Sequence, residues 1–126
     1  MVLDTKPATE KTILIVEDDA ATGELLCLFL SEETPHRAIL VPDGFHALNV
    51  IKDITPDLFL LDYRLPRMNG KELYNQLHTT QGLEHIPTIM TSTNALEQET
   101  EDPNVTVCIK PFDLDELLTM VEKLLA

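Results

Sequence analysis

Four short apolar runs in this chain each lead to side chains that could do chemistry. Glu17 and Asp18 follow the first run, Asp62 ends the second, Ser92 follows the third, and Lys110 follows the fourth. A short apolar run bounded by turn residues is typical of a strand buried on both faces, as in a parallel sheet. The carboxyl ends of parallel strands share one edge of the sheet, where ligands bind. We therefore expect these five side chains to meet at that edge.

Three carboxylates gathered there would repel one another and raise a carboxyl pKa. A hard divalent cation with oxygen ligands removes this conflict, and Mg²⁺ is usually held by one or two carboxylates plus waters. Lys110 and the hydroxyl of Ser92 could then bind an anion against the metal. Such a site is equipped for phosphoryl transfer onto Asp62, which would become an acyl phosphate.

Each of these residues also has a purely structural interpretation. The acids could cap a helix or begin a turn, Ser92 could begin a loop, and Lys110 could be a surface lysine. Their coincidence on all four strand ends favours the functional interpretation.

The strands that would position these groups are expected at residues 12–16, 37–41, 58–61, 86–91 and 105–109. They alternate with segments whose apolar residues recur at helical spacing. Alternation of this kind predicts βαβ units, right-handed crossovers and a parallel sheet covered on both faces. The predicted fold is a small, doubly wound α/β domain with three layers and five parallel strands.

A few residues mark where the predicted helices begin or end. One helix runs through residue 30 with Asp19 as its N-cap, a third covers 71–78, and a last one covers 112–125. Asp113 is placed to cap the last helix, with Glu116 completing a pattern like a capping box. A short second helix is expected to turn Phe45 and Leu48 inward.

The composition restricts the class of protein. The 126 residues fit one domain, and 22 acidic residues against 9 Lys and Arg give a net charge of −13. This charge argues against nucleic acid and against an anionic membrane surface as direct partners. Neither Cys27 nor Cys108 belongs to a C-x-x-C pair, and the chain shows no signal peptide and no apolar run of membrane-spanning length. We expect a cytoplasmic protein.

The motifs around these residues resemble the receiver domain of two-component response regulators, with its flavodoxin-like fold typified by CheY. The likeness runs from Lys11 to the C-terminus. The acid pair is matched by Glu17 and Asp18, the phosphoacceptor by Asp62 within Leu60-Leu61-Asp62-Tyr63-Arg64-Leu65-Pro66-Arg67-Met68-Asn69-Gly70, the switch hydroxyl by Ser92 and the lysine by Lys110 in Lys110-Pro111-Phe112. The spacings agree as well, with 44 positions from Asp18 to Asp62 and 30 from Asp62 to Ser92.

The resemblance implies a set of Mg²⁺ ligands. Asp18 and Asp62 would bind the ion directly, and the main-chain carbonyl of Arg64 would be the third protein ligand. Glu17 would act mainly through water.

The resemblance also implies the reaction and its partners. Asp62 would accept a phosphoryl group from a phosphohistidine on a sensor kinase or histidine phosphotransfer protein. Lys110 would pair with that group, Ser92 would hydrogen-bond it, and the bond from Lys110 to Pro111 would be cis. The residues Arg64 and Asn94 occupy positions that tune hydrolysis of the acyl phosphate in this family. A protein target downstream, and a monomer or weak dimer, are expected.

Two departures from the family pattern lie together. Ser92 and Lys110 are 18 positions apart, which is short by about one helical turn of ~3.6 residues. The deficit falls on the acidic segment 95–104, so the helix expected there is shortened or irregular. Val107 stands where receivers often carry a Tyr or Phe that reorients on activation. Both departures affect the surface through which receivers commonly signal.

Three functional interpretations compete. The leading one is a phosphoacceptor receiver over residues 11–126, after a polar extension over 1–10, that signals through protein contacts and is not an enzyme in the usual sense. The alternative is a receiver-like binding module that acts without phosphorylation. An aspartyl-phosphate hydrolase of the haloacid-dehalogenase type is disfavoured because Arg64 stands where that family has a second carboxylate. The start of the chain and the helix ending at Leu125 favour a stand-alone receiver over a fragment.

Overall fold

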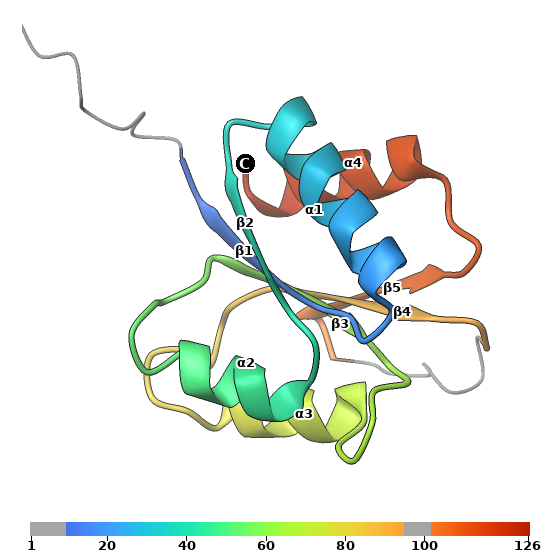
Figure 1. Ribbon diagram of the computed structural model, residues 1–126. Helices are drawn as coiled ribbons and strands as arrows, with labels where there is room; N and C mark the ends of the chain where they lie inside the picture. Colours follow the sequence, from blue (N-terminus) through green and yellow to red (C-terminus); the bar gives the residue numbers. More distant parts are fainter. Residues whose placement is uncertain (1–9, 95–101) are drawn as a thin grey trace, which may run out of the picture.

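A parallel sheet lies between two pairs of helices in the computed structural model, which describes residues 10–94 and 102–126 (Figure 1). The strands are β1 (Thr12–Val16), β2 (Arg37–Val41), β3 (Leu58–Asp62), β4 (Thr88–Ser92) and β5 (Val105–Ile109). The helices are α1 (Ala20–Glu33), α2 (Gly44–Val50), α3 (Gly70–His78) and α4 (Leu114–Leu124). The predicted alternation of strands and helices is confirmed. The helix expected within 95–104 falls mostly on residues outside the described part, as does the polar extension before residue 10.

The strand order is β2-β1-β3-β4-β5, and every neighbouring pair is parallel. This is the order of the flavodoxin-like doubly wound sheet, as predicted. All five residues of β3 are buried because this strand is central and has helices on both faces. The register aligns Val16 with Leu61 and Asp62 with Thr91, so the strands end together along one edge.

Alternate side chains of the central strands enter two separate cores. Leu14, Phe59 and Leu61 point to the face covered by α2 and α3. Ile13 and Leu60 point to the face covered by α1 and α4 (Figure 1). The period-two alternation of a strand therefore places apolar residues on both faces of the sheet. This double burial explains why the strand sequences are continuously apolar.

Side-chain caps begin each helix. Asp19 accepts a hydrogen bond from the Thr22 amide at 3.0 Å, as its predicted role requires. Asp113 caps α4 but accepts from the Asp115 amide at 2.7 Å, so its cap does not use the position of Glu116. A complete capping box begins α3. The Glu72 amide donates to the Asn69 side chain at 2.9 Å, and the Asn69 amide donates to the Glu72 side chain at 3.1 Å.

The predicted inner face of α2 is wrong at one residue. Phe45 is 48% exposed, whereas Ala47 is fully buried and Leu48 packs against the core. Phe45 and Ala47 are two positions apart, which is roughly 200° around a helix of about 3.6 residues per turn. With Ala47 facing the sheet, Phe45 must face outward. None of the helices in the described ranges has the length and apolar character needed to cross a bilayer.

Candidate functional site

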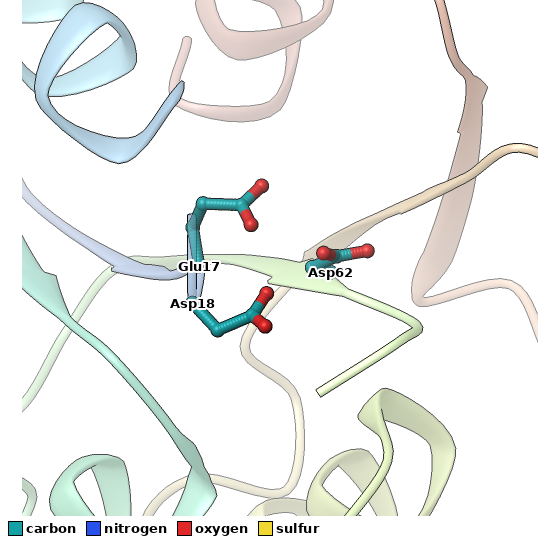
Figure 2. A group of neighbouring side chains, drawn as sticks. All are labelled: Glu17, Asp18 and Asp62. Atoms are coloured by element: carbon teal, nitrogen blue, oxygen red, sulfur yellow. The ribbon is translucent and has the colours of Figure 1, made fainter. Parts of the chain in front are cut away.

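Three carboxylates converge where β1 and β3 end. Glu17 and Asp18 directly follow β1, and Asp62 is the last residue of β3 (Figure 2). One carboxylate oxygen from each lies within 4.8 Å of the others. The parallel pairing of β1 with β3 brings these ends together, although 44 positions separate Asp18 from Asp62.

Lys110 supplies a positive charge to the same edge. Its Nζ lies 3.2 Å from Glu17 Oε1 and 3.3 Å from Asp62 Oδ2. Burial by itself lowers the pKa of this ammonium, but the attraction of Asp62 and Glu17 outweighs burial and raises the pKa above its usual value. Lys110 is therefore charged at neutral pH. The expected cis bond between Lys110 and Pro111 is present.

The charges in the cluster do not balance. Among the residues that the structure describes, three carboxylates against one ammonium leave two negative charges, and the Glu17 and Asp62 side chains are only 3% and 9% exposed. The pKa of Asp18 is raised, first by partial burial and then by its proximity to Glu17. Uncompensated negative charge on hard oxygen ligands fits a divalent cation such as Mg²⁺. The donor set thus matches the ion that the sequence predicts.

Ser92, which carries the predicted hydroxyl, is joined to Lys110 through the backbone. The Lys110 amide donates to the Ser92 carbonyl oxygen at 2.7 Å, which joins the ends of β4 and β5. Ser92 is buried, and its Oγ accepts from the Asn94 amide at 3.1 Å. Thr91, the residue before Ser92, is in register with Asp62, so Ser92 lies at the same edge of the sheet as the carboxylates.

The loop after β3 begins against the Asp62 carboxylate. The Arg64 amide donates to Asp62 Oδ1 at 3.2 Å, while Oδ2 of the same carboxylate faces Lys110. Both carboxylate oxygens therefore have defined donors. Asp62 is buried and oriented by its neighbours.

Sequence reasoning missed a second group of residues near this edge. Asp43, which lies between β2 and α2, is buried and accepts from Arg67 Nη2 at 3.0 Å. These residues are 24 positions apart, so no local pattern could indicate their contact. The Pro42-Asp43-Gly44 turn was a signal for an N-cap, and Asp43 does cap α2.

The two departures from the family pattern differ in how far the structure describes them. Val107 is half-buried in β5. Most of segment 95–104 lies outside the described residues; only 102–104 are described, as part of the turn into β5.

Comparisons with known proteins agree with the fold and the motifs. The sequence model of the response regulator receiver domain matches residues 13–122. The DNA-binding response regulator MtrA of Mycobacterium tuberculosis is 34% identical over 117 residues, covering 86% of this chain and 48% of MtrA. The chain thus spans about half the length of this curated relative.

Two solved structures illustrate the structural likeness. The phosphorylated cyanobacterial phytochrome response regulator RcpA superposes with a TM-score of 0.73 and 30% identity, covering 90% of each chain. The chemotaxis response regulator CheY4 of Vibrio cholerae has a TM-score of 0.82, covering 91% of this chain and 98% of its own. At 21% identity, CheY4 supports the fold alone.

Proposed function

The chain belongs to the response regulator receiver family, and from this we propose that Asp62 accepts a phosphoryl group from a phosphohistidine in a Mg²⁺-dependent reaction. The donor would be a sensor kinase or a histidine phosphotransfer protein, and the product would signal through protein contacts. The observation that carries this proposal is the convergence of Asp62 with Glu17, Asp18 and Lys110. We also propose that this exchange takes place in the cytoplasm.

In the proposed step, a carboxylate oxygen of Asp62 attacks the phosphorus atom of the phosphohistidine. The new P–O bond forms as the P–N bond breaks, and the released imidazole nitrogen keeps its electron pair and takes up a proton. Mg²⁺ bound at the cluster would offset the negative charge of the transferred phosphoryl oxygens. Asp18, Asp62 and the main-chain carbonyl of Arg64 would hold the ion, with Glu17 acting mainly through water.

The remaining side chains act on the phosphoryl group directly. Lys110, now 3.3 Å from Asp62 Oδ2, would pair with a phosphoryl oxygen once the acyl phosphate forms. The hydroxyl of Ser92, which donates to the Asn94 carbonyl oxygen at 3.2 Å, would instead donate to another phosphoryl oxygen. This exchange would couple phosphorylation to the turn that follows β4.

A binding module that acts without phosphorylation is the second candidate. Val107, too short to swap between inward and outward positions, favours it. The complete set of Glu17, Asp18, Asp62, Ser92 and Lys110 favours the phosphoacceptor.

Intact-protein mass spectrometry after incubation with acetyl phosphate and Mg²⁺ separates the two. The wild type is expected to gain one phosphoryl group, and Asp62→Asn is expected to gain none. Asp53→Asn, which changes an exposed aspartate after α2, is the matched control and should react like the wild type. Beryllofluoride should shift the amide resonances near Asp62 in the wild type and in Asp53→Asn, but not in Asp62→Asn. An unmodified wild type with no beryllofluoride response would refute the phosphoacceptor and leave the binding module.

A further inference from the structure

The loop between Asp62 and α3 contains a strained turn at Arg67. Its φ of 66° is in the left-handed region, which a side chain with a Cβ rarely adopts. Across it, the Met68 amide donates to the Pro66 carbonyl oxygen at 2.7 Å. A bond from residue i+2 to residue i with positive φ between them marks the rare, strained type of γ-turn. Such strain persists only where the surroundings impose it.

The Arg67 side chain is held from two sides. Its Nη2 lies 3.0 Å from Asp43 Oδ2, and its guanidinium carbon lies 5.0 Å from the centre of the Phe45 ring. The second distance is within the range of a cation–π contact. We call Asp43, Phe45 and Arg67 the loop clamp.

The carboxylate of the loop clamp is itself fixed. Asp43 is 5% exposed, and its Oδ1 accepts from the amide and from Nδ1 of His46, each at 2.8 Å. The two hydrogen bonds from His46 lower the pKa of Asp43, followed by the charge of Arg67. Asp43 is therefore an ionised, oriented anchor at the start of α2.

Packing beside the clamp joins the same two loops. The Met68 side chain is buried, and its Sδ would lie 2.9 Å from a Cβ placed on Gly44. At the other end of the loop, the Gly70 amide donates to the Tyr63 carbonyl oxygen at 2.8 Å. Residues 63–70 are thus fastened at both ends and at the turn. The Arg64 carbonyl lies between these fastened points.

We propose that Arg67 is a positioning residue, and that its contact with Asp43 holds the γ-turn so that the Arg64 carbonyl is aimed at the Mg²⁺ site. This inference rests on the proposed function, because it assumes that the site binds Mg²⁺. Arg67 touches neither the metal nor the phosphoryl group; it acts through the backbone between Pro66 and Arg64.

The direction in which loss of the Arg67 charge changes Mg²⁺ affinity distinguishes a positioning role from long-range charge repulsion. Removing the cation of Arg67 would tighten Mg²⁺ binding if only long-range repulsion mattered, because the ion and the guanidinium are both positive. Loss of positioning has the opposite effect. Residues that orient metal ligands typically change metal affinity by about tenfold or more when mutated.

The experiment measures Mg²⁺ dissociation constants from amide shifts during titration of the full chain. Arg67→Gln keeps the length of the side chain and removes its charge, and Asp43→Asn keeps an N-cap acceptor and removes the carboxylate. Each variant should weaken Mg²⁺ binding about tenfold, and the double variant should be no weaker than either single one. Lys71→Gln, a matched loss of an exposed cation at the start of α3, should bind Mg²⁺ as well as the wild type or slightly better.

Melting temperatures in EDTA complete the test. Variants that melt earlier but keep the wild-type Mg²⁺ affinity would show that the clamp only stabilises the fold, which would overturn the inference and leave the proposed function intact. Tighter Mg²⁺ binding by Arg67→Gln would overturn it in favour of long-range charge. A wild type that binds no Mg²⁺ would instead refute the proposed function itself.

Discussion

Neutralising Asp18 should stabilise the metal-free protein while removing its response to Mg²⁺. Asp18 lies within 4.8 Å of two other carboxylates and feels the opposing attraction of one ammonium, that of Lys110. The net effect is about one unit of like-charge repulsion. At 4.8 Å this is worth about 0.9 kcal/mol in water and about 3.5 kcal/mol at an effective dielectric constant of 20. Because Asp18 is exposed, the value near that of water applies.

Asp18→Asn should therefore raise the free energy of unfolding by about 1 kcal/mol, or the melting temperature by about 4 °C, in EDTA at neutral pH. Saturating Mg²⁺ should reverse the order. At a free concentration 100 times its dissociation constant, the ion adds about 2.7 kcal/mol to the wild type. The variant, lacking one charged ligand, should gain much less. Thermal and urea denaturation, with and without Mg²⁺, measure both effects.

The pH dependence follows from the raised pKa of Asp18. Repulsion is fully present above that pKa and disappears once the carboxyl is protonated, so the advantage of the variant should shrink as the pH falls through the raised pKa of Asp18. Asp19→Asn is the matched control, since Asp19 caps α1 outside the cluster and Asn also caps helices. It should not raise the metal-free stability, because hydrogen bonds from Thr22 stabilise the ionised Asp19, and it should keep the Mg²⁺ response. A variant of Asp18 that is less stable than wild type in EDTA, or equally stabilised by Mg²⁺, would contradict this reasoning.

Three further changes test other contacts in the domain. Gly70→Ala should destabilise by about 3 kcal/mol or more in urea denaturation, because its Cβ would lie 2.6 Å from the Asp62 carbonyl oxygen; a loss below 1 kcal/mol would contradict this crowding. Tyr74→Phe should cost about 2 kcal/mol, since the Tyr74 hydroxyl donates to the Asp102 carboxylate, and an unchanged urea midpoint would show that this bond contributes little. Thr88→Val should stabilise by about 1 kcal/mol, because Thr88 Oγ1 is buried without a hydrogen-bond partner among the described residues. A less stable valine variant would mean that this hydroxyl is satisfied.

Much of the fold was predictable because local patterns and tertiary structure agree. The five apolar runs are continuous where strands are buried on both faces, so the strand positions were readable from the sequence. Parallel strands then brought the chemistry of Glu17, Asp18, Asp62 and Lys110 to one edge without further information. Topology alone was sufficient because each of these residues directly ends or follows a strand.

The contacts that sequence reasoning missed are those between segments far apart in the chain. The Asp43–Arg67 pair and the Tyr74–Asp102 hydrogen bond join residues 24 and 28 positions apart. No periodicity connects such residues, because each contact depends on how two separate segments meet in space. The contact between the Phe45 ring and the Arg67 guanidinium has the same origin.

The two cores on opposite faces of the sheet have a consequence for how this domain can change. Leu73 and Leu77 pack in one cluster and Leu117 and Val121 in the other, with the backbone of the central strands between them. Stability effects of substitutions that share no partners are additive. Substitutions within one helical layer should therefore leave the stability contributed by the opposite layer unchanged, so a binding partner selected on one face need not disturb the helices on the other.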